Sequence, residues 1–470
     1  MKGKFLVPLL ASAIVFFSCS KDRLIESQST GSLEKKAIAN LQAGKFGNGI
    51  FNDLGRGYDM TGQFANAEAV ANRVLNIDAL NASQAGRVIA DSIYSQEYEE
   101  NYGENAESYS QSLTSKLNAG FSLPLFGKTL TNSFNSSDSS QHAFNSKYIY
   151  GSCNVVVKQL RHRINAPINI LLTSLDANFL QDIKTLSAES IVKSYGTHVL
   201  VDIYAGAAMD VLFQSETKHE NRFNAAKSGA SSAMKDVFNI SIANGSETSS
   251  SNDNYNRTLK YKTRGGDPSK ALVNTINLDI SKPQVSFASW QASSTISNSV
   301  LVDIAPNGLI SLDEFIADPT KKSEVKAYIS KYLLDRKTKL YHERVPIYSY
   351  VKNGGGIHLL SQSAYEGSYW KNETIGFYAY ANPVNNSIPV RWYTTSPTMR
   401  DNLYTLNFGD GYWNDFKGVV FYAYRNQEPG TVPIYEYTNK DGKDHYYSPN
   451  IEGDPYWRRR GIAFYAYPKK

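Results

Sequence analysis

The chain has 470 residues, of which 41% are hydrophobic and 20% are charged, and its formal net charge is +5. These values fit a globular protein of two or three domains, and they give no reason to expect nucleic-acid binding. The only two cysteines, Cys19 and Cys153, exclude a disulfide framework and a cysteine-based zinc site. The 32 tyrosines are unusual, and they crowd into the last third of the chain.

The N-terminus has the features of an export signal. Two lysines precede an apolar run over residues 5–17, which is too short for a membrane-spanning helix. The run ends at Ser18 and Cys19, and a small residue directly before a cysteine resembles a bacterial lipoprotein cleavage site. We therefore expect acylation of Cys19; cleavage nearby with a free Cys19 is the alternative. This predicts an exported lipoprotein of the outer membrane or cell surface, or a form released from it.

Glycine-rich and alternating segments follow the polar N-terminal region. Residues 47–59 contain Gly-Asn-Gly and Gly-Arg-Gly-Tyr-Asp, which predict tight turns and do not match the dinucleotide-binding pattern. Residues 67–93 have mixed apolar spacing and predict short helices. Residues 116–125 alternate strictly between apolar and polar, which predicts a strand. That strand is either half buried in a soluble sheet or, at its length, able to cross a membrane in a barrel.

A strand, a helix and a turn are expected next. Residues 148–160 predict a second strand that holds Cys153 as a buried, inert thiol, and residues 182–193 predict a short helix. The following residues are Tyr195, Gly196, Thr197 and His198. They form a turn that runs into a β-branched apolar strand, and the glycine allows a sharp entry. Since no second base or ligand lies near His198 in sequence, we interpret it as a hydrogen-bonded core histidine.

Residues 223–238 can be read with two different periods. Apolar residues recur there at helical spacing, and most of them are small. From Phe238, however, Ile240 and Ile242 continue an alternation of apolar and polar residues, as in a strand. The remaining expectations are a polar loop over 246–256, a strand over 259–263 that ends at Gly265 and Gly266, and a capped helix over 311–332.

The last third of the chain is a threefold repeat with a period of 43 or 44 residues. Four features recur: Pro346, Pro389 and Pro433; His358, Asn402 and His445; the Tyr-Trp pairs that end at Trp370, Trp413 and Trp457; and Phe-Tyr-Ala-Tyr from Phe377, Phe421 and Phe464. Each unit is too small to bury its own aromatic face, so three units must share one core. This predicts an all-β domain with pseudo-threefold symmetry, either a β-prism, which we prefer, or a β-trefoil.

The Tyr-Trp pairs have two interpretations. Their tryptophans either pack in the core or form three sugar-stacking or receptor-binding pockets, one in each unit. The candidate ligand-binding residues are Trp370, Trp413, Trp457, His358, Asn402 and His445. Because Asn402 replaces the third histidine, we do not expect a symmetric metal site, and we expect no cofactor.

Several of these features together resemble the membrane-attack-complex/perforin (MACPF) family: the Tyr-Gly-Thr-His turn at 195–198, the Gly-x-Gly-Tyr-Asp run, and Gly265-Gly266. The resemblance implies an α+β fold like that of perforins and cholesterol-dependent cytolysins. A bent four-stranded antiparallel sheet, with Gly265 and Gly266 at its bend, would carry two helical clusters near residues 108–146 and 218–257. Three of its strands would contain Tyr150, Val201 and Leu259. The expected divisions are a signal peptide (1–18), a tether (19–40), the MACPF domain (41–338) and the repeat domain (341–470).

The resemblance implies a pore-forming effector or toxin. Its helical clusters would unfurl into amphipathic hairpins, and a ring of copies would close them into a barrel, since lipid tolerates no open sheet edge. The expected partners are membrane lipid, further copies of the chain, and a surface glycan or receptor held by residues 341–470. The alternatives are a non-lytic glycan-binding adhesin and a hydrolase. No Gly-x-Ser-x-Gly or His-Glu-x-x-His motif occurs, so we do not expect an enzyme.

Overall fold

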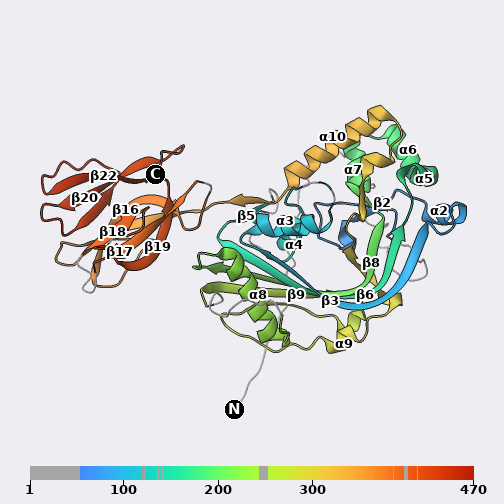
Figure 1. The fold of residues 1–470 in the computed structure, drawn as a ribbon, viewed down its shortest axis with the longest axis horizontal. Coiled ribbons are helices and arrows are strands. Elements are labelled where there is room, and N and C mark those ends of the chain that lie inside the picture. Colours follow the sequence, from blue (N-terminus) through green and yellow to red (C-terminus); the bar gives the residue numbers. More distant parts are fainter. Residues whose placement is uncertain are drawn as a thin grey trace, which may run out of the picture. The chain divides into compact units, whose positions relative to one another are not determined.

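The computed structural model describes residues 53–118, 120, 122–134, 137–138, 142–242, 252–384, 386–395, 401–409 and 411–469 (Figure 1). The predicted signal peptide, the tether and Cys19 lie outside these residues. Within them, no helix is long and apolar enough to span a bilayer.

A long antiparallel sheet forms the centre of the first part of the chain. Its strands lie in the order β10-β9-β8-β6-β3, and short β11 also pairs with β8. Figure 1 shows that β3, β6 and β8 curve together. The predicted bent four-stranded sheet is therefore confirmed, with β10 added at one edge. The strands are β3 (Val88–Gly103), β6 (Tyr148–Ile164), β8 (Asp202–Thr217), β9 (Asn254–Arg264), β10 (Val273–Asn277) and β11 (Val300–Ile304).

Helical clusters connect neighbouring strands of this sheet, as predicted. Helices α3 (Ala106–Lys116) and α4 (Gly127–Thr131) lie between β3 and β6 in the chain, and α8 (Arg222–Phe238) lies between β8 and β9. The middle of β8 is buried on both faces. Strand residues alternate between faces, so one set packs in the core with α3 and the other packs beneath α8.

A smaller sheet and several short helices complete this part of the chain. The sheet has the order β12-β7-β1-β2 and places β7 beside β1. Its strands are β1 (Arg56–Tyr58), β2 (Val70–Arg73), β7 (His198–Leu200) and β12 (Leu309–Ser311). The helices are η1 (Ala67–Ala69), α2 (Ile77–Ser83), α5 (Ile168–Leu171), η2 (Leu172–Ser174), α6 (Ala177–Thr185), α7 (Ala188–Tyr195), η3 (Pro268–Lys270), α9 (Ala288–Gln291), η4 (Ile296–Asn298), η5 (Leu312–Phe315) and α10 (Pro319–Arg336). A third sheet contains β4 (Ser137–Asp138), β5 (Ala143–Asn145) and β13 (Lys339–Tyr341).

Two strand predictions are wrong for this conformation. The described part of the alternating segment, residues 116–118, 120 and 122–125, does not form a strand: α3 continues to Lys116, and Asn118 and Gly120 have positive φ angles of 48° and 78°. Such angles interrupt an extended backbone. Val201 was expected within the central sheet but lies between β7 and β8. Its amide donates to Gly308 there, because the chain passes from the small sheet to the central sheet at this point.

The prediction of short helices over 67–93 is confirmed only for η1 and α2, because Val70–Arg73 is strand β2, and the helix prediction over 311–332 needs correction at its ends. From Val88 the chain is the long strand β3, not a helix. The sequence does not predict β3 as a strand because most of its residues are polar. They are polar because β3 forms one edge of the sheet. Residues 311–332 are two elements, since Asp318 caps a new helix whose first residue is Pro319. The stretch 182–193 is likewise interrupted at the cap Ser187.

Each unit of the repeat domain consists of three antiparallel strands, and the first two units join through β16 and β19 into one six-stranded sheet. In each, the first strand lies between the other two. The strands are β14 (Arg344–Lys352), β15 (His358–Ser361) and β16 (Trp370–Tyr380); β17 (Ile388–Thr394), β18 (Asn402–Thr405) and β19 (Asp415–Ala423); β20 (Val432–Asn439), β21 (His445–Ser448) and β22 (Trp457–Ala466). The prediction of an all-β domain built from three similar units is therefore confirmed.

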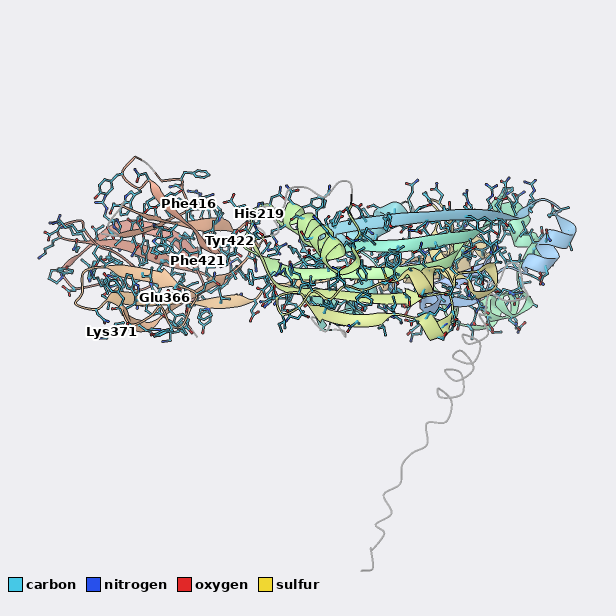
Figure 2. The ribbon with its side chains drawn as sticks, turned by 90° about the horizontal axis from the view of Figure 1, so that it is seen from below. His219, Glu366, Lys371, Phe416, Phe421 and Tyr422 are labelled. Carbon is cyan, nitrogen blue, oxygen red and sulfur yellow. The ribbon has the colours of Figure 1, made fainter. Side chains whose placement is uncertain are left out.

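Aromatic residues from all three units meet on this axis. The rings of Phe377, Phe421 and Phe464 lie with centroids 5.5–5.7 Å apart. Figure 2 shows Phe421 within the domain and Lys371, which is exposed, at its outer side. Short bridges also join Tyr380 to Tyr422, Tyr424 to Tyr465, and Tyr378 to Tyr467. These bridges link each unit to the next and close the ring.

Candidate functional site

Helix α8 lies unusually close to the central sheet because its buried face is made of small residues. A Cβ added to Gly151 of β6 would lie 2.7 Å from the Cβ of Ala230. One added to Gly229 would lie 2.6 Å from the Phe213 ring of β8. The buried residues of the helix include Ala225, Ala226, Ser228, Gly229, Ala230, Ala233, Met234 and Val237. The predicted helix with a small apolar stripe on the sheet is thus confirmed.

Helix α8 is held at both ends by noncovalent contacts, among them hydrogen bonds from Arg222 at its start to the carbonyls of Ser146 and Lys147. Asn221 caps its N-terminus, and the Asn254 side-chain amide donates to the carbonyl of Ala225 over 2.9 Å. At the other end, Asp236 pairs with Lys282 at 2.7 Å between partly exposed side chains. A small buried residue and a surface ion pair each stabilise the helical conformation of α8 only slightly, because the first buries little apolar area and the second gains little Coulomb energy in water.

The other cluster packs on the opposite face of the sheet. Tyr109 of α3 donates from its hydroxyl to Ser152 of β6 over 3.0 Å, and its ring lies 6.3 Å from that of Tyr150. The Leu125 amide donates to Thr114 over 3.1 Å, which fixes the chain after α3. Each cluster therefore covers a face of the sheet between two antiparallel strands.

The two long edges of the sheet differ. β3 forms one edge, where Tyr94 and Tyr98 are exposed. At the other, β10 pairs with β9 from Thr258 to Lys262 and occupies its hydrogen-bonding groups. β3 therefore has a neighbouring strand on one side only, whereas β10 covers the corresponding part of β9.

The predicted bend glycines follow β9 directly and lie where the backbone requires glycine. Gly265 and Gly266 have φ angles of 68° and 74°. A Cβ at Gly265 would lie 2.6 Å from the carbonyl oxygen of Gly206 in β8. The buried Trp290 indole donates to the Gly265 carbonyl over 3.0 Å. The turn is therefore held from two sides.

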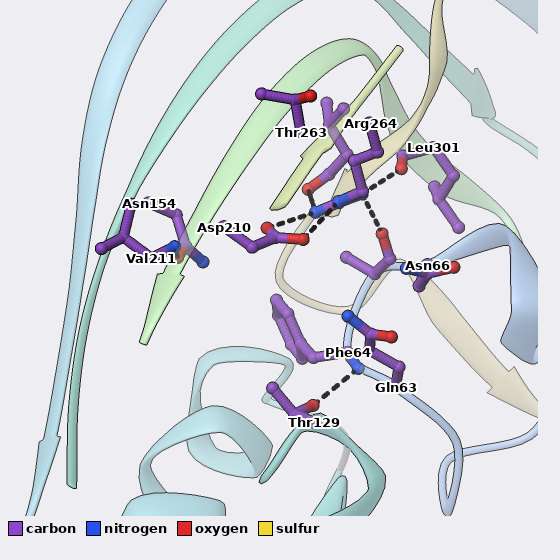
Figure 3. A network of polar contacts seen from close by, with 12 residues as sticks. Gln63, Phe64, Asn66, Thr129, Asn154, Asp210, Val211, Thr263, Arg264 and Leu301 are labelled. Carbon is purple, nitrogen blue, oxygen red and sulfur yellow. Dashed lines mark hydrogen bonds and ion pairs between the residues drawn. The ribbon is translucent and has the colours of Figure 1, made fainter. Parts of the chain in front are cut away.

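Arg264, directly before these glycines, joins four segments (Figure 3). Its guanidinium pairs with Asp210 of β8 at 2.9 Å and donates to the carbonyl of Ala65 over 2.6 Å. It also donates to the carbonyls of Leu301 and Val302 in β11. Since the side chains of both charged residues are only 14% exposed, the pair is held in a poorly solvated place. We refer to these five residues as the Arg264 cluster.

The Tyr-Gly-Thr-His residues contact the Gly-Arg-Gly-Tyr-Asp run at residues 55–59. Gly196 ends α7 with a φ of 73°, and a Cβ there would lie 2.5 Å from the carbonyl carbon of Tyr58. Thr197 donates from its amide to the Tyr58 carbonyl and accepts from the Met60 amide. The Tyr195 hydroxyl donates to Asp182 over 2.7 Å.

His198 is buried behind this turn. Its Nδ1 lies 3.0 Å from the Thr197 hydroxyl, and burial lowers the pKa of the imidazole to about 4. A neutral, enclosed imidazole beside a threonine suits a structural role. The four residues hold α7, β7 and β1 together, consistent with the predicted role in a strand turn.

In the repeat domain, each predicted tryptophan is half buried, and the tyrosine before it is exposed. The two rings of each pair stand nearly perpendicular, with centroids 5.1–5.4 Å apart and interplanar angles of 83–90°. The tryptophans are therefore not in the central core that Phe377, Phe421 and Phe464 form. Each pair makes an aromatic corner at the domain surface.

Two of the corners contain a histidine from the next unit. Trp457 lies 5.4 Å from His358, and Trp413 lies 5.3 Å from His445. Asp444 accepts from both the amide and the imidazole of His358, and Asp401 does the same for His445. The other imidazole nitrogen faces a carboxylate, Glu373 at 3.8 Å or Glu436 at 3.4 Å, and burial raises the pKa of Glu436. The named contacts contain no serine or cysteine nucleophile, so they orient the ring and do not form a base–nucleophile pair.

The third position differs from the other two. Asn402 is completely buried, donates to the carbonyl of His358 over 2.6 Å, and accepts from the Trp392 indole over 2.8 Å. Its amide is thus engaged inside the domain. In the described part of the chain, no group of three or more candidate ligand side chains could hold a metal ion.

Comparison with known proteins agrees with this geometry. Residues 48–339 match the model of the MAC/Perforin domain. The chain belongs to the MAC/Perforin family. Its fold is that of a pore-forming family, and residues 391–467 match a domain of unknown function, DUF5648. No curated protein matches the sequence.

Two solved structures resemble this MAC/Perforin protein. GNIP1Aa from Chromobacterium piscinae has 13% sequence identity and a TM-score of 0.53 over 89% of this chain and 92% of its own. A MAC/Perforin-domain protein from Bacteroides thetaiotaomicron has 16% identity and a TM-score of 0.48, with 66% of each chain covered, just under two thirds of its length. At these identities the likeness to GNIP1Aa shows the fold, which extends through the repeats.

Sequence reasoning missed several residues of this MAC/Perforin protein. Arg264 and Asp210 were not expected to meet, since nothing in their local patterns gives the register of β8 against β9. Asp401 and Asp444 had a visible signal: each directly precedes the recurring Asn402 or His445 of its unit. The first unit has Ile357 at that place.

Proposed function

We propose that this protein is a surface lipoprotein that makes pores in a target membrane. In this proposal, residues 341–470 recognise the target, residues 41–338 assemble with further copies, and the two helical clusters become membrane-crossing hairpins. The observation that carries it is α8, a helix of small residues that covers the sheet between β8 and β9. No catalytic role is assigned to any residue.

The sequence of α8 supports both conformations. As a helix, it buries its alanines on Gly151 and Phe213. As a strand, Phe238, Ile240 and Ile242 would point to one side, while Lys227 and Lys235 would point to the other. A lysine that faces lipid at mid-bilayer costs about 2–4 kcal/mol in a barrel, so this separation favours insertion. Asp236 has the lipid-facing parity and would need a place near an interface.

Assembly would require both edges of the sheet. β3 is one edge already, and β10 would have to leave β9 before a neighbouring copy could pair there. Closure into a ring would then satisfy every edge, as a membrane barrel requires.

A covalent cross-link across the Asp236–Lys282 ion pair tests the proposal, because it ties the C-terminal end of α8 to the segment that follows β10. In the chain from residue 20 onward, Asp236→Cys and Lys282→Cys would be joined by a bismaleimide linker that contains a disulfide. The unmodified protein should release dye from liposomes or bacterial membrane vesicles, the cross-linked variant should not, and a reductant, which cleaves the linker, should restore release. The two single-cysteine variants are the controls. Release by the fully cross-linked protein, or none by the unmodified protein on any membrane, would contradict pore formation.

The second candidate is a non-lytic adhesin. The half-buried tryptophans with exposed tyrosines beside them favour it, because such corners suit ligand contact whether or not α8 moves. An adhesin would bind its glycan or receptor through residues 341–470 and release no dye. The same release assay therefore separates the two functions.

A further inference from the structure

The three aromatic corners of the repeat domain are not equivalent, although the tryptophans recur with one period. Trp413 and Trp457 each have a histidine ring with its centroid 5.3–5.4 Å from the tryptophan ring. That histidine comes from the following unit around the axis. By the threefold symmetry, the residue that corresponds to these histidines at the Trp370 corner is Asn402, and the amide of Asn402 is used inside the domain. The repeat of the tryptophans predicted three similar pockets. The histidine contacts set the pockets at Trp413 and Trp457 apart from the one at Trp370.

The site at Trp457 is built from two units. The third unit supplies Trp457, Tyr446 and Asp444, and the first supplies His358 and Glu373. The Tyr446 ring lies 5.2 Å from Trp457 and 5.0 Å from His358, so three rings surround one place. The Asp444 carboxylate accepts hydrogen bonds from the backbone amide and the imidazole Nδ1 of His358. Both N···O distances are 2.9 Å, and the two bonds fix the ring. The His358 side chain remains 13% exposed and Glu373 35%, so polar groups still reach solvent there.

The site at Trp413 has the same histidine, aspartate and glutamate, but Leu403 stands where the Trp457 site has Tyr446. Asp401 of the second unit fixes His445 of the third, and Glu436 lies 3.4 Å from the far imidazole nitrogen. The His445 side chain is 11% exposed and Glu436 24%. Glu373 and Glu436 come from different positions in their units, yet each puts a carboxylate at the same distance range from its histidine.

We propose that the repeat domain has two binding sites of similar design, at Trp413 and Trp457, each for one sugar residue of an uncharged glycan. This rests on the proposed recognition role of residues 341–470. A tryptophan face packs against the apolar face of a sugar, and fixed imidazole and carboxylate groups bond its hydroxyls. Asp401 and Asp444 are buried and paired with the histidines, so the partly exposed Glu373 and Glu436 carry the negative charge that disfavours sialic and uronic acids. A single chain then binds two branches of one glycan, which raises avidity.

The test uses the chain from residue 20 onward and a panel of neutral oligosaccharides that end in glucose, galactose, mannose or N-acetylglucosamine, with sialylated counterparts. Titration calorimetry should give two sites for a neutral ligand. Trp413→Ala and Trp457→Ala should each leave one site, and the double variant should leave none. Trp370→Ala is the matched control and should keep both. Asp444→Asn, which weakens the fixing of His358, should lower the affinity of one site about tenfold and leave the other unchanged.

Other results would overturn the inference. Three sites with one lost in Trp370→Ala would show that the corners are equivalent. Binding to no neutral oligosaccharide, or tighter binding to the sialylated forms, would refute the ligand class. Dye release by a protein that binds no sugar would refute this inference alone, and sugar binding by a protein that never releases dye would refute pore formation alone.

Discussion

Gly57 and Tyr195 are far apart in sequence but in close contact, because a Cβ added to Gly57 would lie 1.7 Å from the Tyr195 carbonyl oxygen. The glycine-rich run near the start of the domain thus fits directly over the end of α7. Both sequence motifs serve one junction, which joins β1, β7 and α7.

We expect Gly57→Ala to destabilise the perforin domain by about 3 kcal/mol or more, since backbone atoms on both sides would have to move. Gly196→Val should have an effect at least as large, because it adds the strain of a positive φ to a backbone clash. Urea unfolding curves measure both. Gly453→Ala, where a Cβ meets nothing within 4 Å, is the control and should leave the midpoint unchanged. Wild-type stability for Gly57→Ala would disprove the close contact.

His198 predicts a loss of stability in acid. Burial lowers its pKa to about 4 in the folded protein, below the usual value of 6.5. The unfolded chain therefore binds a proton that the folded chain does not, and stability falls as the pH falls from about 6.5 to 4. The full contribution is up to about 3 kcal/mol.

The measurement is the free energy of unfolding of His198→Gln and of the unmodified protein at pH 7.5 and 4.5. The variant should be less stable than the unmodified protein at pH 7.5, and the difference should shrink at pH 4.5. His162 is also buried with a pKa lowered to about 4, so part of the acid sensitivity should persist. An equal difference at both pH values would show that His198 is not held neutral.

The Arg264 cluster predicts a large effect from a change that preserves shape. Asp210→Asn leaves a poorly solvated guanidinium without its carboxylate partner, and breaking such a pair costs about 3–5 kcal/mol. Arg257→Gln removes an arginine from a pair with Asp279 that is about one third exposed, and it should cost less than about 1 kcal/mol. Thermal unfolding should separate the two variants clearly. Similar midpoints would show that the pair in the cluster is solvated.

Local pattern was a sound guide where one face of an element is apolar. The small-residue period of α8 predicted both its helix and its buried face, and the recurring aromatics predicted a shared threefold core. The pattern of apolar residues failed to predict the structure of segments in which burial does not determine where the apolar residues lie. The polar edge strand β3 carries little apolar signal, and the alternation over 116–125 is broken by the positive φ angles of Asn118 and Gly120.

The site contacts depended on register, which sequence does not give. Nothing in one unit shows that Asp444 reaches His358 of another, because the contact depends on how the units close around the axis. The same holds for Arg264 and Asp210, whose meeting requires the pairing of β9 with β8. The recurrence of Trp370, Trp413 and Trp457 was visible, but the inequality of their surroundings was not.

Cys19 predicts lipid attachment. It ends the apolar run directly after Ser18, and it lies outside the described residues. Mass spectrometry of the native N-terminus should find acyl chains on Cys19, and Cys19→Ala should release the protein from membranes. An unmodified Cys19 that retains the signal, or cleavage at another residue, would contradict the assignment.

The last prediction concerns the parity of residues after α8. In the proposed inserted strand, Ile240 faces lipid together with Phe238, whereas Ser241 faces the lumen. Ile240→Lys should therefore abolish dye release, since a lysine toward mid-bilayer costs about 2–4 kcal/mol in each subunit of the ring. Ser241→Lys adds the same charge one residue away and should leave release nearly unchanged. Ile240 is half buried and Ser241 exposed in the described conformation, so thermal unfolding must accompany the assay. If both folded variants release dye equally, the segment does not cross the membrane as this strand.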